Sequence, residues 1–286
     1  PCSLRQSYLL KYYNTVYTSP LAHYDKYNIL HAGSTMTKPN WKPTSPLNAI
    51  CFDCDGTLSS IEGIDQLALY NNVADQVEQL TFFAMEKTGI NLDLYTKRMN
   101  LVKPTAIQLT QLANDYHLNR TDDIDIVISI LKKLNKSIFI ISAGNNPAVS
   151  LFGKLLGINP SNCFAININF GPEGQYHDFE SDSPLIHNHG KKQIINQIKK
   201  EHSSVLHIGD GLNDLIAKQC ADRFIGYGGH KFRQNIKDSC DFYITSTSLL
   251  PLLPLSLTEN EVAHLKVDEY QFYKKGLALL SQPTHN

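Results

Sequence analysis

The chain has 286 residues, enough for one large domain or for a domain with a smaller companion. Its 26 Lys and Arg residues nearly balance its 27 Asp and Glu residues, and this near-neutrality argues against nucleic-acid or anionic-membrane binding. No run of about 18 apolar residues predicts a membrane span, no signal peptide is evident, and the six cysteines form no CxxC pair. We therefore expect a cytoplasmic protein with reduced thiols that binds neither nucleic acid nor membrane.

The first 47 residues show no helical or strand periodicity. Three prolines fall within the stretch "TKPNWKPTSP", and proline disrupts both helices and central strands. We expect residues 1–47 to form an N-terminal extension that ends in a linker.

Regular patterns begin directly after this linker. Short apolar runs predict buried strands at 48–53, 136–144, 204–211 and 222–229. Between them, helical spacing of apolar residues predicts helices within 63–117 and at 191–200. Strands that alternate with helices favour an α/β fold, here a Rossmann-like parallel sheet with helices on both faces.

Three polar side chains stand at the carboxyl ends of predicted strands: Asp53, Ser142 and Asp210. Open α/β sheets bind their ligands at these ends. The helical block after the first strand is much longer than a simple crossover needs, so it predicts a small inserted helical cap. The expected boundaries are 48–66 and 135–254 for the catalytic core, 67–134 for the cap, and 1–47 and 255–286 for two terminal extensions.

The stretch "DCDGT" at 53–57 places two carboxylates one residue apart. Asp53 and Asp55 repel each other, and a divalent cation is the simplest way to offset that repulsion. Magnesium prefers a few carboxylate oxygens together with waters and a phosphate oxygen, and Asp210 in "GDGLND" is the natural further ligand. Cys54 lies between the two carboxylates, and strand alternation predicts that its side chain points into the core.

Four motifs in one order resemble those of phosphatases of the haloacid dehalogenase superfamily. They are "DCDGT" with Thr57, Ser142 in "IISAG", Lys191 in "HGKKQII", and "GDGLND" at 209–214. The resemblance implies that Asp53 takes the phosphoryl group as an aspartyl phosphate, while Asp55 acts as general acid and then as general base. It further implies that Mg²⁺ binds Asp53, Asp210 and the backbone carbonyl of Asp55, that Ser142 and Lys191 hold the phosphoryl oxygens, and that Asp214 orients Lys191 or a metal-bound water.

Further segments resemble the phosphoserine phosphatase family over about residues 48–250. These are "SSIEGIDQLA", "AMEK", "YTKRMNLVKP" and "CADRFIGYGGHKFRQNIKDSCDFYIT". The resemblance implies that Glu62 binds the substrate's amino group, that Arg98 binds its carboxylate and that Met85 is an apolar neighbour. It also places Ala143, Gly144 and Asn213 at the substrate, with Ala143 standing where the family usually has Gly. The substrate is then a small phosphorylated metabolite, with O-phosphoserine the best single prediction and L-serine the product.

Three alternatives stay open at this point. The first is the same mechanism acting on another small phosphate, and the second is a phosphotransferase that passes the phosphoryl group to an acceptor alcohol. The third is a regulatory or binding protein on the same scaffold. His187 and His189 precede Lys191 without a third metal ligand in view, so we expect loop residues there. The sequence leaves the oligomeric state and the roles of both extensions open.

Overall fold

The computed structural model describes residues 41–87 and 91–280. Within them a seven-stranded sheet has the order β4-β3-β2-β1-β5-β6-β7. Its neighbouring strands run parallel except β3 and β4, which are antiparallel. The strands are β1 (Ala49–Phe52), β2 (Ser137–Asn146), β3 (Cys163–Phe170), β4 (Tyr176–Phe179), β5 (Val205–Gly209), β6 (Arg223–Tyr227) and β7 (Phe242–Ile244). The predicted α/β fold is confirmed.

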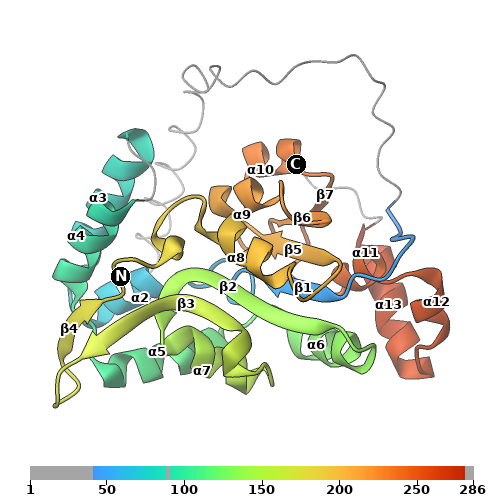
Figure 1. The fold of residues 1–286 in the computed structure, drawn as a ribbon, viewed down its shortest axis with the longest axis horizontal. Coiled ribbons are helices and arrows are strands. Elements are labelled where there is room, and N and C mark those ends of the chain that lie inside the picture. The colour runs from blue at the N-terminus through green and yellow to red at the C-terminus, as the bar shows by residue number, and fades with distance from the viewer. Residues whose placement is uncertain (1–40, 88–90, 281–286) are drawn as a thin grey trace, which may run out of the picture. The chain divides into compact units, whose positions relative to one another are not determined.

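Helices lie on both sides of this sheet, with α5, α6 and α7 along its lower side in the view of Figure 1 and α8, α9 and α10 on the other side. The α-helices are α2 (Gly63–Tyr70), α3 (Ala74–Lys87), α4 (Leu92–Val102), α5 (Ala106–Leu118), α6 (Ile124–Lys133), α7 (Ala148–Leu155), α8 (Gly190–Ile198), α9 (Leu212–Ala217), α10 (Gln234–Ser239), α11 (Leu252–Ser256), α12 (Glu259–Ala263) and α13 (Val267–Leu280). Two short 3-10 helices, η1 (Pro160–Asn162) and η2 (Pro184–Ile186), complete the described secondary structure. The long helical block expected after the first strand corresponds to α2–α5, and α6 leads into β2.

The core lies between the sheet and its two layers of helices. Every residue of β1 and of β5 is buried, as expected for parallel strands that are covered on both faces. The covering helices are amphipathic, and α8 buries Ile194, Ile195 and Ile198 together with Lys191 at its start. The apolar stripe of each covering helix therefore explains why helices pack on both faces of the sheet.

The strand order reverses between β1 and β5. From β1 the chain adds β2 and β3 on one side, and β5, β6 and β7 then extend the sheet on the other side. A reversal of this kind is a topological switch point, and ligands of open α/β sheets bind outside the carboxyl ends of the strands there. The residues that follow β1 and β5 are Asp53 and Asp210.

Strand β2 departs from the predicted second strand in one useful way. It continues to Asn146, and its register with β3 shifts between Ile141 and Asn145. The irregularity contains Ser142, Ala143 and Gly144, so a bulge re-aims the second motif at the end of the strand.

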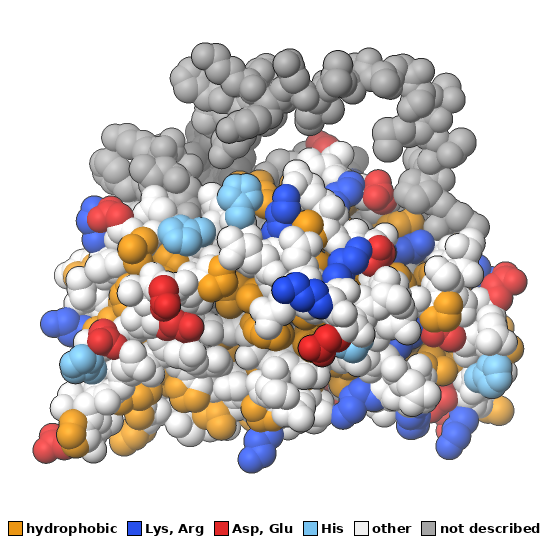
Figure 2. Space-filling model, viewed as in Figure 1, with side chains coloured by type: hydrophobic (Ala, Val, Ile, Leu, Met, Phe, Trp, Pro, Cys, Tyr) orange, Lys and Arg blue, Asp and Glu red, His pale blue; other side chains and the backbone are white. Residues whose placement is uncertain are grey.

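The C-terminal segment packs on the core. All five residues of α11 are buried, and Tyr273 of α13 is only 3% exposed. No helix in the described ranges is long and apolar enough to cross a membrane. Acidic and basic side chains are interspersed over the face shown in Figure 2, in keeping with the balanced charge of the sequence.

Candidate active site

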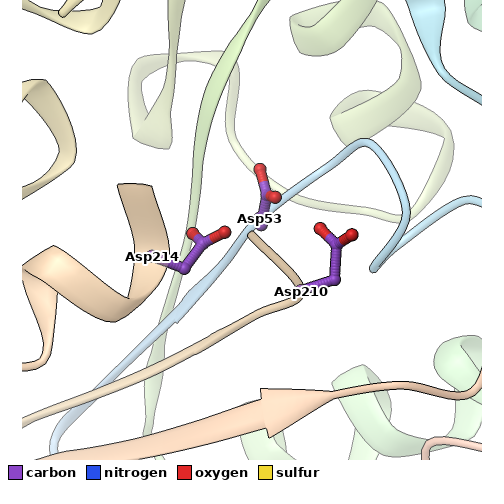
Figure 3. A group of neighbouring side chains, drawn as sticks. All are labelled: Asp53, Asp210 and Asp214. Carbon is purple, nitrogen blue, oxygen red and sulfur yellow. The ribbon is translucent and has the colours of Figure 1, made fainter. Parts of the chain in front are cut away.

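Three buried carboxylates meet at the switch point (Figure 3). Asp53 follows β1, Asp210 follows β5, and Asp214 lies in the first turn of α9. One oxygen from each of the three lies within 4.8 Å of the others. Burial and the carboxylates of Asp214 and Asp210 raise the pKa of Asp53, and burial likewise raises the pKa of Asp210.

Lys191 supplies a buried positive charge to this cluster from the first turn of α8. Its Nζ lies 2.6 Å from Oδ1 of Asp53 and 2.7 Å from Oδ1 of Asp214. Burial lowers the pKa of Lys191, but the two carboxylates outweigh burial and raise it above its usual range. The lysine is therefore held as an ammonium between two acceptors.

Asp214 has hydrogen-bond donors on both of its oxygens. Oδ1 also lies 2.8 Å from Nε2 of His207, a fully buried residue of β5, and Oδ2 accepts a hydrogen bond from the Gly211 N–H at 3.0 Å. The other ring nitrogen of His207 lies 3.1 Å from the Cys51 carbonyl oxygen. Burial raises the pKa of Asp214, but Lys191 and His207 outweigh burial and hold it well below its usual range. The geometry thus joins Asp214 to the lysine that it is expected to orient.

The Asp55 carboxylate is held apart from this triplet. Its Oδ1 accepts hydrogen bonds from the Gly63 N–H at 2.6 Å and from the Tyr116 hydroxyl at 2.7 Å. Its Oδ2 accepts a hydrogen bond from Oγ of Ser142 at 3.1 Å, and Ser142 in turn accepts one from the Gly144 N–H at 2.8 Å. The structure therefore brings the first and second motifs together through Asp55 and Ser142.

Asp210 is fixed by a guanidinium and by a glycine turn. Nη2 of Arg233 donates to its Oδ2 at 3.0 Å. Gly56 has φ +69°, and a Cβ at that position would lie 2.8 Å from the same oxygen. Only glycine combines this backbone conformation with so close an approach to Asp210.

The residues expected to recognise substrate come from the helices after β1 and from loops at the strand ends. Nη2 of Arg98 donates to Oγ1 of Thr81 at 2.6 Å, and the buried Nε of Arg98 has no hydrogen-bond partner among the described residues. Burial lowers the pKa of Arg98, and the charges of Asp65 and Glu62 raise it, so these three groups lie within electrostatic range. Glu62 is the exposed N-cap residue of α2.

Other expected site residues are less directly engaged. The side chain of Asn213 accepts a hydrogen bond from the Asp214 N–H at 3.0 Å, so it borders the cluster. Ala143 is half-buried in the β2 bulge. Thr57 is fully buried, and its carbonyl accepts a hydrogen bond from Thr121 at 2.5 Å. Met85 belongs to α3, but its side chain lies outside the described residues.

The sequence of the core matches a known family. Residues 47–222 fit the family model of haloacid dehalogenase-like hydrolases. The chain belongs to this family.

Individual relatives of this hydrolase are phosphoserine phosphatases. It is 34% identical over 200 residues to that of Bos taurus, in a match that covers 69% of this chain and 89% of the relative. The Homo sapiens enzyme matches with the same identity and coverage.

Solved structures share the fold of this hydrolase. A phospho-aspartyl intermediate analogue of phosphoserine phosphatase aligns with a TM-score of 0.59 and 24% identity, over 73% of this chain and 98% of the other. A phosphoserine phosphohydrolase-like protein from Francisella tularensis subsp. tularensis SCHU S4 aligns with a TM-score of 0.60 and 23% identity, over 70% and 96% of the two chains.

The carboxylates of the hydrolase fit a divalent cation. Asp53, Asp210 and Asp214 carry three negative charges against the two positive charges of Lys191 and Arg233 that contact them, so the cluster keeps negative charge. Hydrogen bonds occupy both oxygens of Asp214, whereas Oδ2 of Asp53 and Oδ1 of Asp210 accept none from the residues that the structure describes. The oxygens left for a metal therefore come from the first and fourth motifs.

Sequence reasoning missed three residues of this site. Tyr116 lies in α5 outside every quoted segment, His207 lies in the predicted strand before the fourth motif, and Arg233 lies within the segment "CADRFIGYGGHKFRQNIKDSCDFYIT", but none of the three was assigned a role. For His207, an imidazole within an otherwise apolar strand was an available signal, because a buried polar group requires a partner. For Cys54 the prediction of a buried core residue is confirmed, since its side chain is fully inaccessible.

Proposed function

We propose that this hydrolase is a magnesium-dependent phosphomonoesterase that converts O-phosphoserine to L-serine and phosphate through an aspartyl phosphate. The observation that carries the proposal is the buried Asp53 carboxylate, held by Lys191 and clustered with Asp210 and Asp214 at the switch point of the sheet. The named relatives, all phosphoserine phosphatases, support the substrate.

In the first step an Asp53 oxygen attacks the phosphorus atom. A bond forms between that oxygen and phosphorus, and the bond between phosphorus and the serine oxygen breaks. The leaving oxygen takes a proton from the Asp55 carboxyl group. Lys191 and Ser142 hold the non-bridging phosphoryl oxygens, whose negative charge they stabilise in the transition state.

In the second step water displaces Asp53 from phosphorus. The Asp55 carboxylate, now deprotonated, takes a proton from the attacking water, and the bond between phosphorus and the Asp53 oxygen breaks. Phosphate leaves and Asp53 is regenerated. One carboxyl group thus serves as acid and then as base, which requires that it stay in one place through both steps.

Magnesium would be held by the carboxylates of Asp53 and Asp210 and by the backbone carbonyl of Asp55. When bound, it would offset the excess negative charge of the cluster and polarise a phosphoryl oxygen.

Substrate recognition is assigned to the helices after β1, which we propose to act as a cap spanning 67–134 over a core of 48–66 and 135–254. Arg98 would bind the carboxylate of phosphoserine, since its buried Nε still lacks an acceptor. Glu62 would bind the ammonium group. Met85, Ala143, Gly144 and Asn213 would border the same substrate.

Five described cysteines are free thiols, which supports the expected cytoplasmic setting.

The test is phosphate release from a panel of phosphomonoesters by the purified chain, with Mg²⁺ and with a chelator. The panel includes O-phosphoserine and phosphoethanolamine, which lacks the carboxylate for Arg98. We expect magnesium-dependent turnover that is strongest on O-phosphoserine. Preference for another compound would discard the assignments of Glu62 and Arg98, and absence of turnover on every compound would discard the phosphatase itself. Transfer to an added alcohol instead of water would indicate a phosphotransferase.

A further inference from the structure

The Asp55 carboxylate receives a hydrogen bond from a tyrosine that lies far away in the sequence. Tyr116 belongs to α5, and its hydroxyl group lies 2.7 Å from Oδ1 of Asp55. Tyr116 is fully buried. The phenolic O–H donates this hydrogen bond and the Asp55 carboxylate oxygen accepts it.

The position of this hydroxyl group is tightly defined. The Tyr116 ring stacks on Phe152 of α7, with ring centroids 5.5 Å apart and planes inclined by 27°. A Cβ on Gly63 would lie 2.0 Å from the Tyr116 hydroxyl oxygen, so the absence of a side chain at residue 63 makes room for it. The N–H of Gly63 donates to the same Asp55 oxygen at 2.6 Å. Two donors from two different helices therefore converge on Oδ1.

Because two donors hold Oδ1, Oδ2 is the oxygen of Asp55 that is placed for proton transfer. Oδ2 faces Oγ of Ser142 at 3.1 Å, on the side where the phosphoryl group is proposed to bind. A carboxylate rotates readily about its last bond, and a general acid or base must lie within hydrogen-bond reach of the atom it serves. Fixing Oδ1 keeps Oδ2 at the leaving oxygen in the first step and at water in the second.

We infer that Tyr116 is a positioning residue for Asp55, which uses its phenolic hydrogen bond to hold that carboxyl group in the orientation that proton transfer requires. This inference rests on the proposed function, because it gives Asp55 the role of general acid and base. It adds a residue outside the four motifs that acts on the chemical step and touches no part of the substrate.

The decisive variant is Tyr116→Phe, which removes the hydroxyl group and keeps the ring. The serine alkoxide needs a proton as it leaves phosphorus. The leaving groups of p-nitrophenyl phosphate and acetyl phosphate, p-nitrophenolate and acetate, are stabilised anions that need none. We expect kcat on phosphoserine to fall about tenfold or more with little change in KM. The rate of phosphoenzyme formation from the two activated phosphates, measured by rapid quench, should fall less than about threefold. The ratio between substrates is independent of how much of the variant is folded.

Tyr70→Phe is the matched control. Tyr70 also donates a hydrogen bond to a carboxylate, that of Asp115, which is the neighbour of Tyr116 on α5. This variant loses the same type of hydrogen bond on the same helix but does not touch Asp55, so we expect its ratio of rates between substrates to equal that of the wild type. A Tyr116→Phe enzyme that behaves like the Tyr70→Phe enzyme would overturn the inference.

A double-mutant cycle with Asp55→Asn shows whether Tyr116 acts through Asp55. If it does, Tyr116→Phe adds little to the loss already caused by Asp55→Asn. Full additivity of the two losses on phosphoserine would overturn the positioning role even if each variant is slow. Failure of the proposed function looks different, because the wild-type chain itself would then release no phosphate from any ester.

Discussion

Lys191 is the buried positive charge between two carboxylates of the site. Its ammonium lies between Asp53 and Asp214 with almost no exposure to solvent. Removing one partner from a buried ion pair leaves an uncompensated charge, which is usually more costly than the pair itself is stabilising. Substitutions of Asp53, Lys191 or Asp214 therefore affect both the free energy of unfolding and the rate of turnover. Tests at the residue scale need variants that separate these two effects.

Asp53→Asn keeps the shape of the proposed nucleophile and removes its charge. An amide cannot form the acyl phosphate, so we expect phosphate release to become undetectable. Steady-state turnover of O-phosphoserine measures this loss, and circular dichroism checks the fold. Wild-type turnover in a folded Asp53→Asn protein would remove Asp53 from the nucleophile role.

Arg98→Ala tests substrate recognition. The guanidinium is proposed to bind the carboxylate of phosphoserine, and a lost charge-assisted hydrogen bond is worth about 1.5 to 3 kcal/mol, or roughly ten- to a hundredfold in kcat/KM. We expect that loss on phosphoserine and a much smaller one on phosphoethanolamine. Thr81→Val, which removes the hydroxyl acceptor of Arg98, is the control for indirect effects of side-chain mobility. Equal losses on both substrates would exclude Arg98 from specificity.

His207 contacts Asp214 through Nε2, so its replacement separates hydrogen bonding from packing. We expect His207→Leu to lower the free energy of unfolding by about 1.5 to 3 kcal/mol, because a buried carboxylate oxygen loses one of its donors. His207→Gln offers an N–H group and should recover part of that loss in urea denaturation. Identical unfolding curves for the two variants would show that ring volume, and not the Nε2 contact, is what matters.

At the scale of elements, the C-terminal helices are tied to the base of the sheet by one buried lysine. Lys136, just before β2, lies 2.9 Å from the Leu47 carbonyl oxygen and 2.6 Å from Oε1 of Glu261 on α12. The side chains of Lys136 and Glu261 are only 2% and 13% exposed. This contact connects the segment before β1, the start of β2 and the C-terminal segment, which the sequence motifs leave without a role.

Glu261→Gln is expected to destabilise the protein by about 3 kcal/mol, because it leaves the Lys136 ammonium buried without its counter-charge. Glu259→Gln on the same helix is the control, since Glu259 is largely exposed and pairs with Lys42 at the surface. Thermal and urea unfolding of the two variants should therefore differ clearly. Matching unfolding midpoints would show that the Lys136–Glu261 pair contributes no more than a surface pair.

At the scale of the whole molecule, the uncompensated carboxylates link metal binding to stability and pH. The raised pKa values of Asp53 and Asp210 mean that these groups bind protons more readily in the metal-free folded protein than in the unfolded chain. Lowering the pH therefore favours the metal-free fold through these two groups. A divalent cation competes with the same protons for the same oxygens.

We expect Mg²⁺ to raise the melting temperature at neutral pH, and we expect this increment to shrink as the pH falls. Differential scanning fluorimetry with and without MgCl₂ across a pH series measures the effect. Asp210→Asn is the control and should show a reduced increment at every pH, because one proposed ligand is lost. An increment that is independent of pH, or unchanged in Asp210→Asn, would contradict a metal site at these carboxylates.

Sequence patterns predicted the strands whose hydrophobic pattern matches their burial in the sheet. The strands β1, β2, β5 and β6 are apolar runs, and their buried surroundings preserve that signal. The strands β3, β4 and β7 were not predicted. In β3 asparagines interrupt the apolar pattern, β4 forms a short antiparallel pair with β3, and β7 has only three residues.

The same distinction applies to the candidate site. Asp53, Ser142 and Asp210 could be placed together because the carboxyl ends of parallel strands meet at one edge of a sheet. The contacts of Tyr116 with Asp55 and of His207 with Asp214 arise from tertiary packing, which spacing along the chain does not encode. The bulge in β2 that aims Ser142 at Asp55 belongs to the same category.

The reversal of strand order also divides the proposed catalytic residues between two stretches of chain. A cut in the turn at 199–204, between α8 and β5, would leave Asp53, Asp55, Ser142 and Lys191 on one fragment and Asp210 and Asp214 on the other. Neither fragment alone would hold a complete set, and the two would have to pair along β1 and β5 to restore it. Phosphatase activity in a mixture of the fragments would then report their reassembly, which makes this fold a candidate split reporter.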